Sequence, residues 1–427
     1  MLSRYSNVGL PEVVTPRPIS APRADIERTL SAEQLKSRES NKCFVPACES
    51  ASPQNERSNH ESEIQLLLSS PATQLYTISH LIFFSILGTL ARLGLVAMTT
   101  YPSAPVTSSV LWPNFAGSLI LGFLAEDLRL FRDEWGVFSS ADDWSFHPIN
   151  LEREEADAVH NAARRHAKVK KTIPLFIGLA TGFCGSFTSF SSFMRDAFLA
   201  LGNGLPSPTS APSSIPSRNG GYSFEALMAI LILHVTVSLS ALKLGAHIAL
   251  TVDPIMPTFA FRRLRSIVDR VMVFLGFGCW IGAVLLSAFP PDEAWRGRVT
   301  YALLFAPLGC LARFYISKHL NPRISSFPLG TFAANIFGTV ILGVCFDLQH
   351  SKFGAVDMMA CRILEGVIEG FCGCVTTVST WVAELNELRK KHSYIYGLTS
   401  VVVALSFLIT IMGSLQWSKG FREPVCA

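Results

Sequence analysis

Two asparagines in apolar stretches have side chains that could bind a small anion. Asn114 begins the sequence Asn-Phe-Ala-Gly-Ser, and Asn335 begins the related sequence Asn-Ile-Phe-Gly-Thr. A side-chain amide offers two N–H donors and carries no charge, so it can replace part of the hydration shell of an anion. A single asparagine of this kind is typical of a hydrogen bond between packed helices. Its duplication in the same setting favours a path for anions.

A cluster of hydroxyl and aromatic side chains offers further groups for an anion. Residues 182–193 read Gly-Phe-Cys-Gly-Ser-Phe-Thr-Ser-Phe-Ser-Ser-Phe, within an apolar run that begins near Ile173. Hydroxyls can donate to an anion, and the edge of a phenylalanine ring carries a positive partial charge. The residues that we predict to line the path are Asn114, Asn335, Phe190, Phe193, Thr188, Ser189, Ser191, Ser192, Ser238, Thr376, Thr377, Ser379 and Ser406.

These residues belong to an internal repeat. The sequence Gly-Phe-Cys-Gly at 182–185 returns 188 residues later, and Arg92 precedes Asn114 by the same 22 residues that separate Arg313 from Asn335. Glycines and hydroxyls disfavour an unbroken helix, so each copy is predicted to contain a broken helix at membrane depth. The two arginines are candidates for a vestibule at the mouth of the path, where a cation would concentrate anions, or for side chains that reach the membrane interface.

The composition is that of an integral membrane protein. Of the 427 residues, 49% are hydrophobic and 16% are charged, whereas soluble domains carry roughly 25% charged residues. Nine apolar runs can each supply the roughly 20 residues of a spanning helix, at about 75–100, 110–131, 172–201, 222–250, 271–290, 299–318, 328–349, 355–386 and 394–417. The net charge of +4 is too small and too scattered to indicate nucleic-acid binding. The cysteines are predicted to be small buried hydrophobes rather than metal ligands or disulfides.

Nine spans predict an all-α polytopic membrane protein with two four-span repeats and one linking helix. The predicted parts are a disordered N-terminal tail at 1–72, a first repeat at 73–250, a linker with a transmembrane helix at 251–298, a second repeat at 299–418 and a C-terminal tail at 419–427. Because the linker adds one crossing, the second repeat starts from the opposite side and the repeats are inverted. Basic residues in the loops after spans two, four and eight predict a cytoplasmic N-terminus and an outside C-terminus.

The motifs together resemble those of the fluoride channel (fluoride exporter) family. They are Gly-x-Leu-Ala-Arg, Asn-x-x-Gly-x-x-x-x-Gly and Gly-Phe-Cys-Gly-x-x-Thr-(Ser/Thr)-x-Ser-(Ser/Thr), each present twice. The double copy with one linking span resembles the eukaryotic members, in which both halves are fused in one chain. The resemblance implies a passive, fluoride-selective channel that works as a single chain, exports fluoride from the cytoplasm, most simply across the plasma membrane, and gives fluoride resistance.

The resemblance also assigns roles to matching positions. It places the two asparagines and the pair Phe190 and Phe193 in the pore, whereas the second copy has Val378 and Trp381 where the family has phenylalanines. That departure implies that one of two pores has decayed. The family holds a structural sodium ion on backbone carbonyls, and the matching positions are Gly185, Thr188, Gly373 and Thr376.

Two other interpretations remain at this stage. An inverted-repeat exporter of small organic cations, driven by protons, would need a buried carboxylate, but the first span has Ser85, Gly88 and Arg92 there. No carboxylate is expected at mid-span in the first copy, while Glu365 and Glu369 lie early in span eight. A non-transporting membrane scaffold would use the broken helices only for packing. The sequence contains no phosphate loop, HExxH motif or nucleophile elbow, so an enzyme is not predicted.

Overall fold

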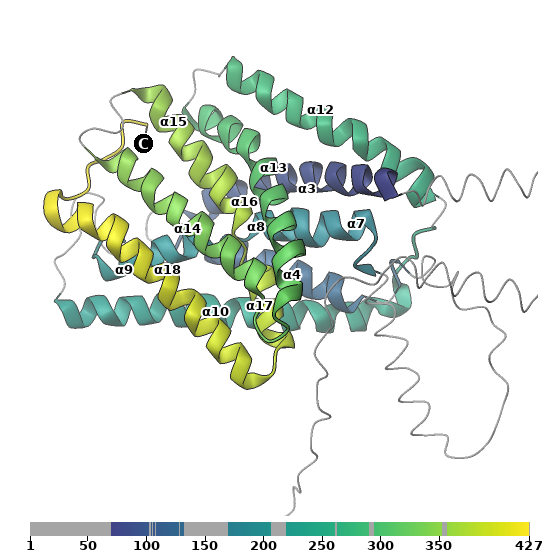
Figure 1. Cartoon of the computed structure of the whole chain (residues 1–427), viewed down its shortest axis with the longest axis horizontal. Helices are drawn as coiled ribbons and strands as arrows, with labels where there is room; N and C mark the ends of the chain where they lie inside the picture. The colour runs from purple at the N-terminus through teal and green to yellow at the C-terminus, as the bar shows by residue number, and fades with distance from the viewer. Residues whose placement is uncertain are drawn as a thin grey trace, which may run out of the picture.

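Helices form the part of the chain that the structure describes (Figure 1). The computed structural model describes residues 70–101, 104, 106, 108–127, 129–131, 170–205, 219–260, 263–289, 294–351 and 357–426. Residues 1–69 of the predicted tail lie outside the described residues. Residues 70–72, the end of that predicted tail, form the first turn of a helix. The long helices are α3 (Ser70–Thr99), α4 (Leu111–Glu126), α10 (Gly220–Val252), α12 (Asp269–Ala288), α13 (Ala294–Leu320), α14 (Leu329–His350) and α18 (Lys390–Lys419). Short turns lie at η2 (Asp253–Ile255), η3 (Leu264–Val268) and η4 (Asn321–Arg323).

The two predicted broken helices are confirmed. The first consists of α7 (Pro174–Ile177), η1 (Gly178–Cys184), α8 (Gly185–Phe187) and α9 (Phe190–Leu201), and the second of α15 (Met358–Gly366), η5 (Val367–Cys372), α16 (Gly373–Val375) and α17 (Ser379–Glu387). Each break falls at a threonine with extended backbone, φ −95° and ψ 149° at Thr188 and φ −99° and ψ 153° at Thr376. A π-helical turn precedes both breaks, and such turns are frequent at functional sites.

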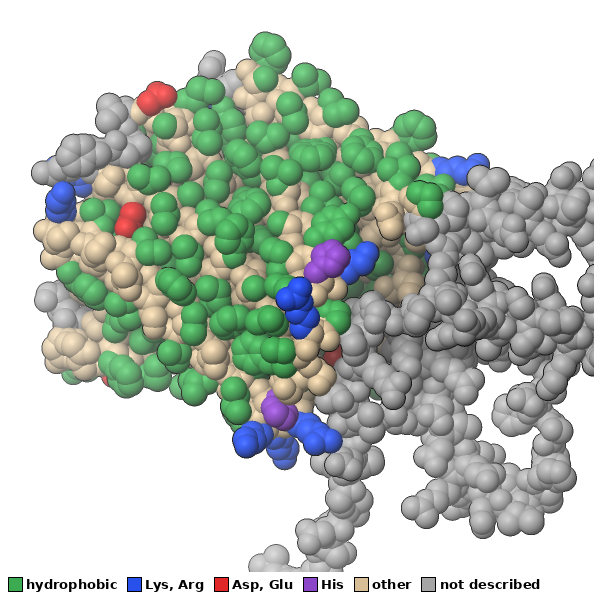
Figure 2. Space-filling model, in the orientation of Figure 1, with side chains coloured by type: hydrophobic (Ala, Val, Ile, Leu, Met, Phe, Trp, Pro, Cys, Tyr) green, Lys and Arg blue, Asp and Glu red, His purple; other side chains and the backbone are tan. Residues whose placement is uncertain are grey.

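The surface and the helix lengths are those of a multi-pass membrane protein. Seven described helices are long and apolar enough to cross a membrane, judged by length and composition. The other two predicted spans correspond to α4, which has 16 residues, and to the interrupted segment from α15 to α17. Figure 2 shows hydrophobic side chains over most of the visible face, with few charged side chains, most of them near its edges. Helix length and composition therefore support seven of the nine predicted crossings among the described residues.

The helices α4 and α10 pack in direct backbone contact. A Cβ added to Gly122 of α4 would collide with the carbonyl of Leu242 in α10, and one added to Gly245 would collide with the carbonyl of Leu119. Only glycine permits this approach. Lys170 holds the C-terminal end of α4, because its ammonium group donates to the carbonyls of residues 124, 125 and 127. Burial lowers the pKa of Lys170 to about 8, while nearby acidic side chains act in the opposite direction.

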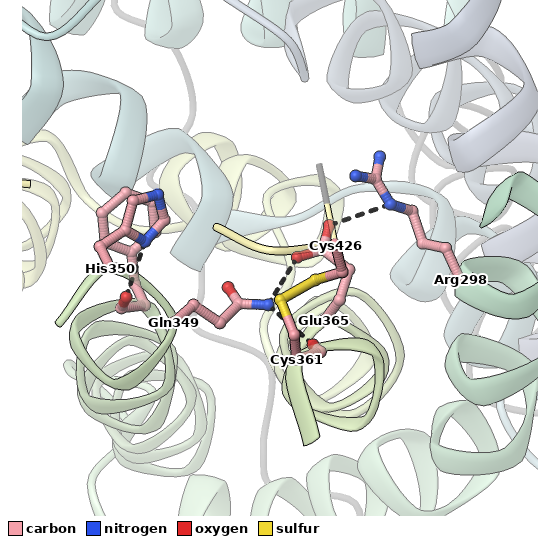
Figure 3. Close-up of a disulfide and its surroundings, with 7 residues drawn as sticks. Arg298, Gln349, His350, Cys361, Glu365 and Cys426 are labelled. Atoms are coloured by element: carbon pink, nitrogen blue, oxygen red, sulfur yellow. Dashed lines mark hydrogen bonds and ion pairs between the residues drawn. A yellow bond between two sulfur atoms is a disulfide. The ribbon is translucent and has the colours of Figure 1, made fainter. Parts of the chain in front are cut away.

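The prediction that the cysteines are buried hydrophobes is wrong for Cys361, which forms a disulfide with Cys426 (Figure 3). The disulfide joins the start of α15 to the C-terminal segment, and Gln349 and Glu365 lie beside it. Five cysteines are buried as predicted, at 184, 310, 345, 372 and 374, whereas Cys279 on α12 is exposed. The disulfide therefore fixes the C-terminal segment against the broken helix of the second copy.

Candidate anion path

The two breaks meet and cap each other. The Thr188 hydroxyl accepts hydrogen bonds from the backbone N–H groups of Val378 and Ser379 at the start of α17, at 3.2 and 3.1 Å. In return, the Thr376 hydroxyl accepts from the N–H of Ser191 at the start of α9, at 3.1 Å. Each threonine thus satisfies the helix N-terminus of the opposite copy, which an unassisted break would leave with free donors.

The remaining hydroxyls of the motif also serve this junction. Ser379 donates to the carbonyl of Cys184 at 3.2 Å, and Ser191 donates to the carbonyl of Cys372 at 3.3 Å. The other members are buried and bonded to protein groups, namely Ser189 to Ser192 at 2.9 Å and Thr377 to Thr188 at 3.1 Å. These predicted path residues therefore hold the two breaks together in the structure.

Both asparagines bind the break of their own copy. The Asn114 side-chain oxygen accepts from the N–H of Ser189 at 2.9 Å, and the Asn335 side-chain oxygen accepts from the N–H of Thr377 at 2.9 Å. The amide oxygen is thus occupied in both asparagines. The amide nitrogen of Asn114 contacts His234 at 3.3 Å, and that of Asn335 donates to the carbonyl of Thr377 at 3.3 Å. The two asparagines therefore hold the two breaks in the same way.

The first copy has a second pair of polar residues one helical turn further along α4 and α10. Asn114 contacts His234, and Gly122 and Gly245 bring α4 and α10 together further along, so the two helices run in the same direction. Ser118 lies one turn after Asn114 on α4, and Ser238 lies one turn after His234 on α10. Both are fully buried, and neither hydroxyl has a hydrogen-bond partner among the described residues. Buried hydroxyls without partners are uncommon and indicate a place for a ligand or water.

The second copy lacks this pair. Thr339, at the position equivalent to Ser118, donates to the carbonyl of Asn335 at 2.7 Å. Ser406, which we predicted to line the path, is exposed and donates to its own helix at Val402 at 2.8 Å. The structure therefore does not bring Ser406 to the path.

The aromatic residues lie on the side of the first copy. Phe193 stacks on His234 with ring centroids 4.5 Å apart, and Phe190 meets Phe193 edge-on at 5.7 Å. Trp381 of the second copy packs against Phe190 at 5.3 Å. Since His234 contacts Asn114, the phenylalanine pair and this asparagine share one region of the protein.

The arginines do not reach the membrane interface. The guanidinium of Arg92 lies over the Cα of Gly373 and donates to the carbonyl of Glu369, and Arg313 lies over Gly185 in the same way. Arg313 donates to the carbonyls of Thr181 and Cys374, both at 2.8 Å. Both side chains are buried, at 0% and 3% exposure. We predicted that the two arginines would lie in a vestibule at the mouth of the path. In the structure each arginine is buried at the break of the opposite copy.

The junction has released carbonyl groups at the positions that the sequence assigns to sodium. In an unbroken helix Ser189 would donate to the carbonyl of Gly185, but it donates to Asn114, and Thr377 likewise donates to Asn335 instead of Gly373. Carbonyl oxygens freed at membrane depth need a partner. The residues fit a sodium ion on this ground, and the ion would share the junction with two guanidinium groups.

The sequence analysis missed several residues beside Asn114. Asp196 lies near the end of the third span rather than at mid-span. It is 2% exposed and accepts hydrogen bonds from Ser108 at 2.8 Å and from Ser109. Arg195 pairs with Asp196 at 3.1 Å.

Glu384 follows Asp196 by the 188 residues of the repeat and accepts from Thr331 near the start of α14, as Asp196 accepts from Ser108 near the start of α4. The internal repeat could therefore point to this carboxylate, but not to His234. A lone histidine in an apolar span was the available signal.

The fold and the site define a multi-pass α-helical membrane protein whose two related halves meet at their broken helices. The chain belongs to the family of CrcB-like proteins (Camphor Resistance, CrcB), whose family model matches residues 80–246 and 300–414. The match in two regions confirms that two copies are fused in this chain, and it confirms the family resemblance seen in the motifs.

Curated relatives span both fused and short proteins. Fluoride export protein 1 of Neurospora crassa is 52% identical over 369 residues, which cover 83% of this chain and 69% of that protein. Fluoride export protein 1 of Candida albicans is 33% identical over 85% of this chain and 86% of that protein. The fluoride-specific ion channel FluC of Acinetobacter baylyi is 34% identical over 26% of this chain and 88% of its own length. No solved structure matches the chain significantly.

Proposed function

We propose that this protein is a passive, fluoride-selective channel that exports fluoride through one path beside Asn114. The observation that carries the proposal is the pair of buried hydroxyls of Ser118 and Ser238, which have no partner among the described residues and lie one turn from Asn114. With the Asn114 amide and the edge of Phe190 or Phe193, they supply several donors and no fixed charge. Fluoride holds its water strongly, so several donors must act together to replace it. The names of the relatives give the same anion.

The driving force needs no coupling to protons or cations. An inside-negative membrane potential favours the exit of an anion by about 2.3 kcal/mol per 100 mV. The one buried carboxylate beside the path, Asp196, is bonded to Ser108 and paired with Arg195, so it is not free to carry a cation. This favours an anion channel over the organic-cation exporter. The unpaired hydroxyls favour it over a scaffold, which gains nothing by leaving them unbonded.

The proposed topology is two inverted four-span repeats around α12, with nine crossings in a single chain. The reciprocal caps at Thr188 and Thr376 support a two-fold relation between the copies. We place the N-terminus in the cytoplasm and the C-terminus outside, in the plasma membrane. The Cys361–Cys426 disulfide supports this orientation, because disulfides persist in oxidising compartments. The sodium ion would be structural and held by the backbone carbonyls of Gly185, Thr188, Gly373 and Thr376.

The test is efflux of fluoride from liposomes that contain the purified protein, with valinomycin and potassium to balance charge. We expect fluoride release that protein-free vesicles do not show, and no comparable release of chloride from matched vesicles. Release of both anions at similar rates would contradict selectivity. Release at the rate of protein-free vesicles, with the protein shown to be folded by its elution profile, would contradict the channel itself.

A further inference from the structure

His234 on α10 lies between Asn114 and a buried carboxylate. The Nδ1 atom of His234 lies 3.3 Å from the side-chain nitrogen of Asn114, and its Nε2 atom lies 2.6 Å from the Ser108 hydroxyl. The Ser108 hydroxyl donates to Asp196 at 2.8 Å. The ring is 1% exposed and stacks on Phe193. The histidine is therefore held at both nitrogens and on one ring face.

The bond with Ser108 fixes the proton of the neutral ring. Asp196 is paired with Arg195, and its carboxylate accepts the one hydroxyl proton that Ser108 has. The Ser108 oxygen must therefore accept the short bond from His234. The ring proton is on Nε2, and Nδ1 carries a lone pair.

The contact with Asn114 gives the same answer independently. The side-chain oxygen of Asn114 accepts from the backbone N–H of Ser189 at 2.9 Å, so the side-chain nitrogen is the atom that faces His234. An amide nitrogen only donates, so Nδ1 must accept from it. Both sides of the ring thus assign the proton to Nε2.

The second copy contains an asparagine that no described histidine holds. Asn335 accepts from the N–H of Thr377 and returns its own N–H to the carbonyl of the same residue, at 3.3 Å. The Asn335 amide is therefore closed on its break. In the first copy His234 takes the corresponding N–H, and among the described residues the other N–H of Asn114 has no partner.

We propose that His234 is the positioning residue of the anion path. Its Nδ1 lone pair holds one N–H of Asn114 and keeps the amide from closing on its own break, so the other N–H stays available to fluoride. Ser108 and Asp196 keep the ring proton on Nε2 and thereby keep Nδ1 an acceptor. The inference rests on the proposed function and explains why Asn114 and Asn335 differ.

The experiment measures fluoride efflux from liposomes that contain variants of the full chain. His234→Leu removes the acceptor, so we expect efflux to fall by about tenfold, the effect of one lost hydrogen bond. In His234→Asn the side-chain oxygen takes the place of Nδ1, and we expect a rate within about threefold of wild type. The matched control is His247→Leu, at an exposed position of the same helix, which should keep the wild-type rate.

Ser108 provides a test that a packing role would not pass. In the wild-type background Ser108→Ala removes the acceptor that fixes the ring proton, and we expect a loss of about threefold to tenfold. An amide has no tautomers, so Ser108→Ala should change the rate of His234→Asn by less than about twofold. A cavity left by Ser108→Ala would instead reduce the rate equally in both backgrounds.

Equal losses from Ser108→Ala in the two backgrounds would overturn the inference, as would a rate for His234→Asn as low as that for His234→Leu. If His234→Leu does not elute as folded protein, the Ser108→Ala comparison decides alone, because it uses only the conservative variant. Absence of efflux from the wild-type chain would overturn the proposed function as well. Wild-type efflux that His234→Leu leaves unchanged would overturn only this inference.

Discussion

In the first copy Asn114 lies beside His234 and one turn from two buried hydroxyls without partners, whereas in the second copy Asn335 returns its amide N–H to the carbonyl of Thr377. The two breaks share an extended threonine whose hydroxyl caps the opposite copy, and an asparagine bonded to the residue that follows that threonine. The difference teaches that the two copies have separate duties. Both copies build the junction, because each caps the other, whereas in the proposed function the donors for an anion belong to the first copy.

The largest difference between the copies is expected from the asparagines. Asn114→Asp places a negative charge in the proposed path, and repulsion of a few kcal/mol between close charges should reduce fluoride efflux by about a thousandfold. Asn335→Asp should reduce it by less than about threefold, since the second copy has no free donors to lose. Efflux from liposomes at equal protein content measures both. Equal losses would show either that both copies conduct or that both asparagines act only in folding. The elution profile of each variant distinguishes these outcomes, because a folding defect changes it.

A smaller effect is expected from the aromatic residues. Phe190→Ile or Phe193→Ile removes the positive ring edge and should lower efflux by about tenfold. Val378→Ala and Trp381→Ala, at the equivalent positions of the second copy, should cost much less at matched expression. Cells that lack their own exporter can be grown over a series of fluoride concentrations. Their resistance should fall more with the two phenylalanine variants than with Val378→Ala or Trp381→Ala. A greater loss from Trp381→Ala than from Phe193→Ile would reverse the assignment of the conducting side.

The sequence analysis predicted the features that both copies of the repeat share. It missed contacts that depend on how the two copies pack together. The breaks and the asparagine bonds follow from short motifs present twice, so their local geometry could be inferred. The position of Arg92 could not, because a long side chain is placed by the opposite copy, here over Gly373. Ser406 is predicted to line the path because it is a hydroxyl in the ninth span, but it lies on an exposed face of α18. The Cys361–Cys426 disulfide joins residues 65 apart through a C-terminal segment without a pattern of its own.

A modest effect on stability is expected from removal of sodium. Purification in N-methyl-D-glucamine chloride should lower the Tm by several degrees, since a ligand that binds only the folded state adds to its stability. Sodium should restore the Tm and potassium should not. An unchanged Tm across the three salts would contradict a sodium ion at the junction, without bearing on the difference between the copies.

The smallest effect on transport is expected from the disulfide. Cys426→Ser should leave fluoride efflux within about twofold, because the disulfide holds the C-terminal segment and lies away from Asn114. In intact cells, a reductant that cannot cross membranes should make Cys361 and Cys426 reactive toward an impermeant maleimide. Reactivity only after permeabilisation would reverse the proposed orientation.

The central claim is that the hydroxyl pair of the first copy conducts and its counterpart in the second copy does not. The most direct measurement compares two double variants by fluoride efflux from liposomes, Ser118→Ala with Ser238→Ala and Thr339→Ala with Ser406→Ala. We predict that the first falls by about tenfold or more, the effect of two lost donors, and that the second stays within about twofold of wild type. Equal rates for the two variants, or a greater loss in the second, would contradict the account.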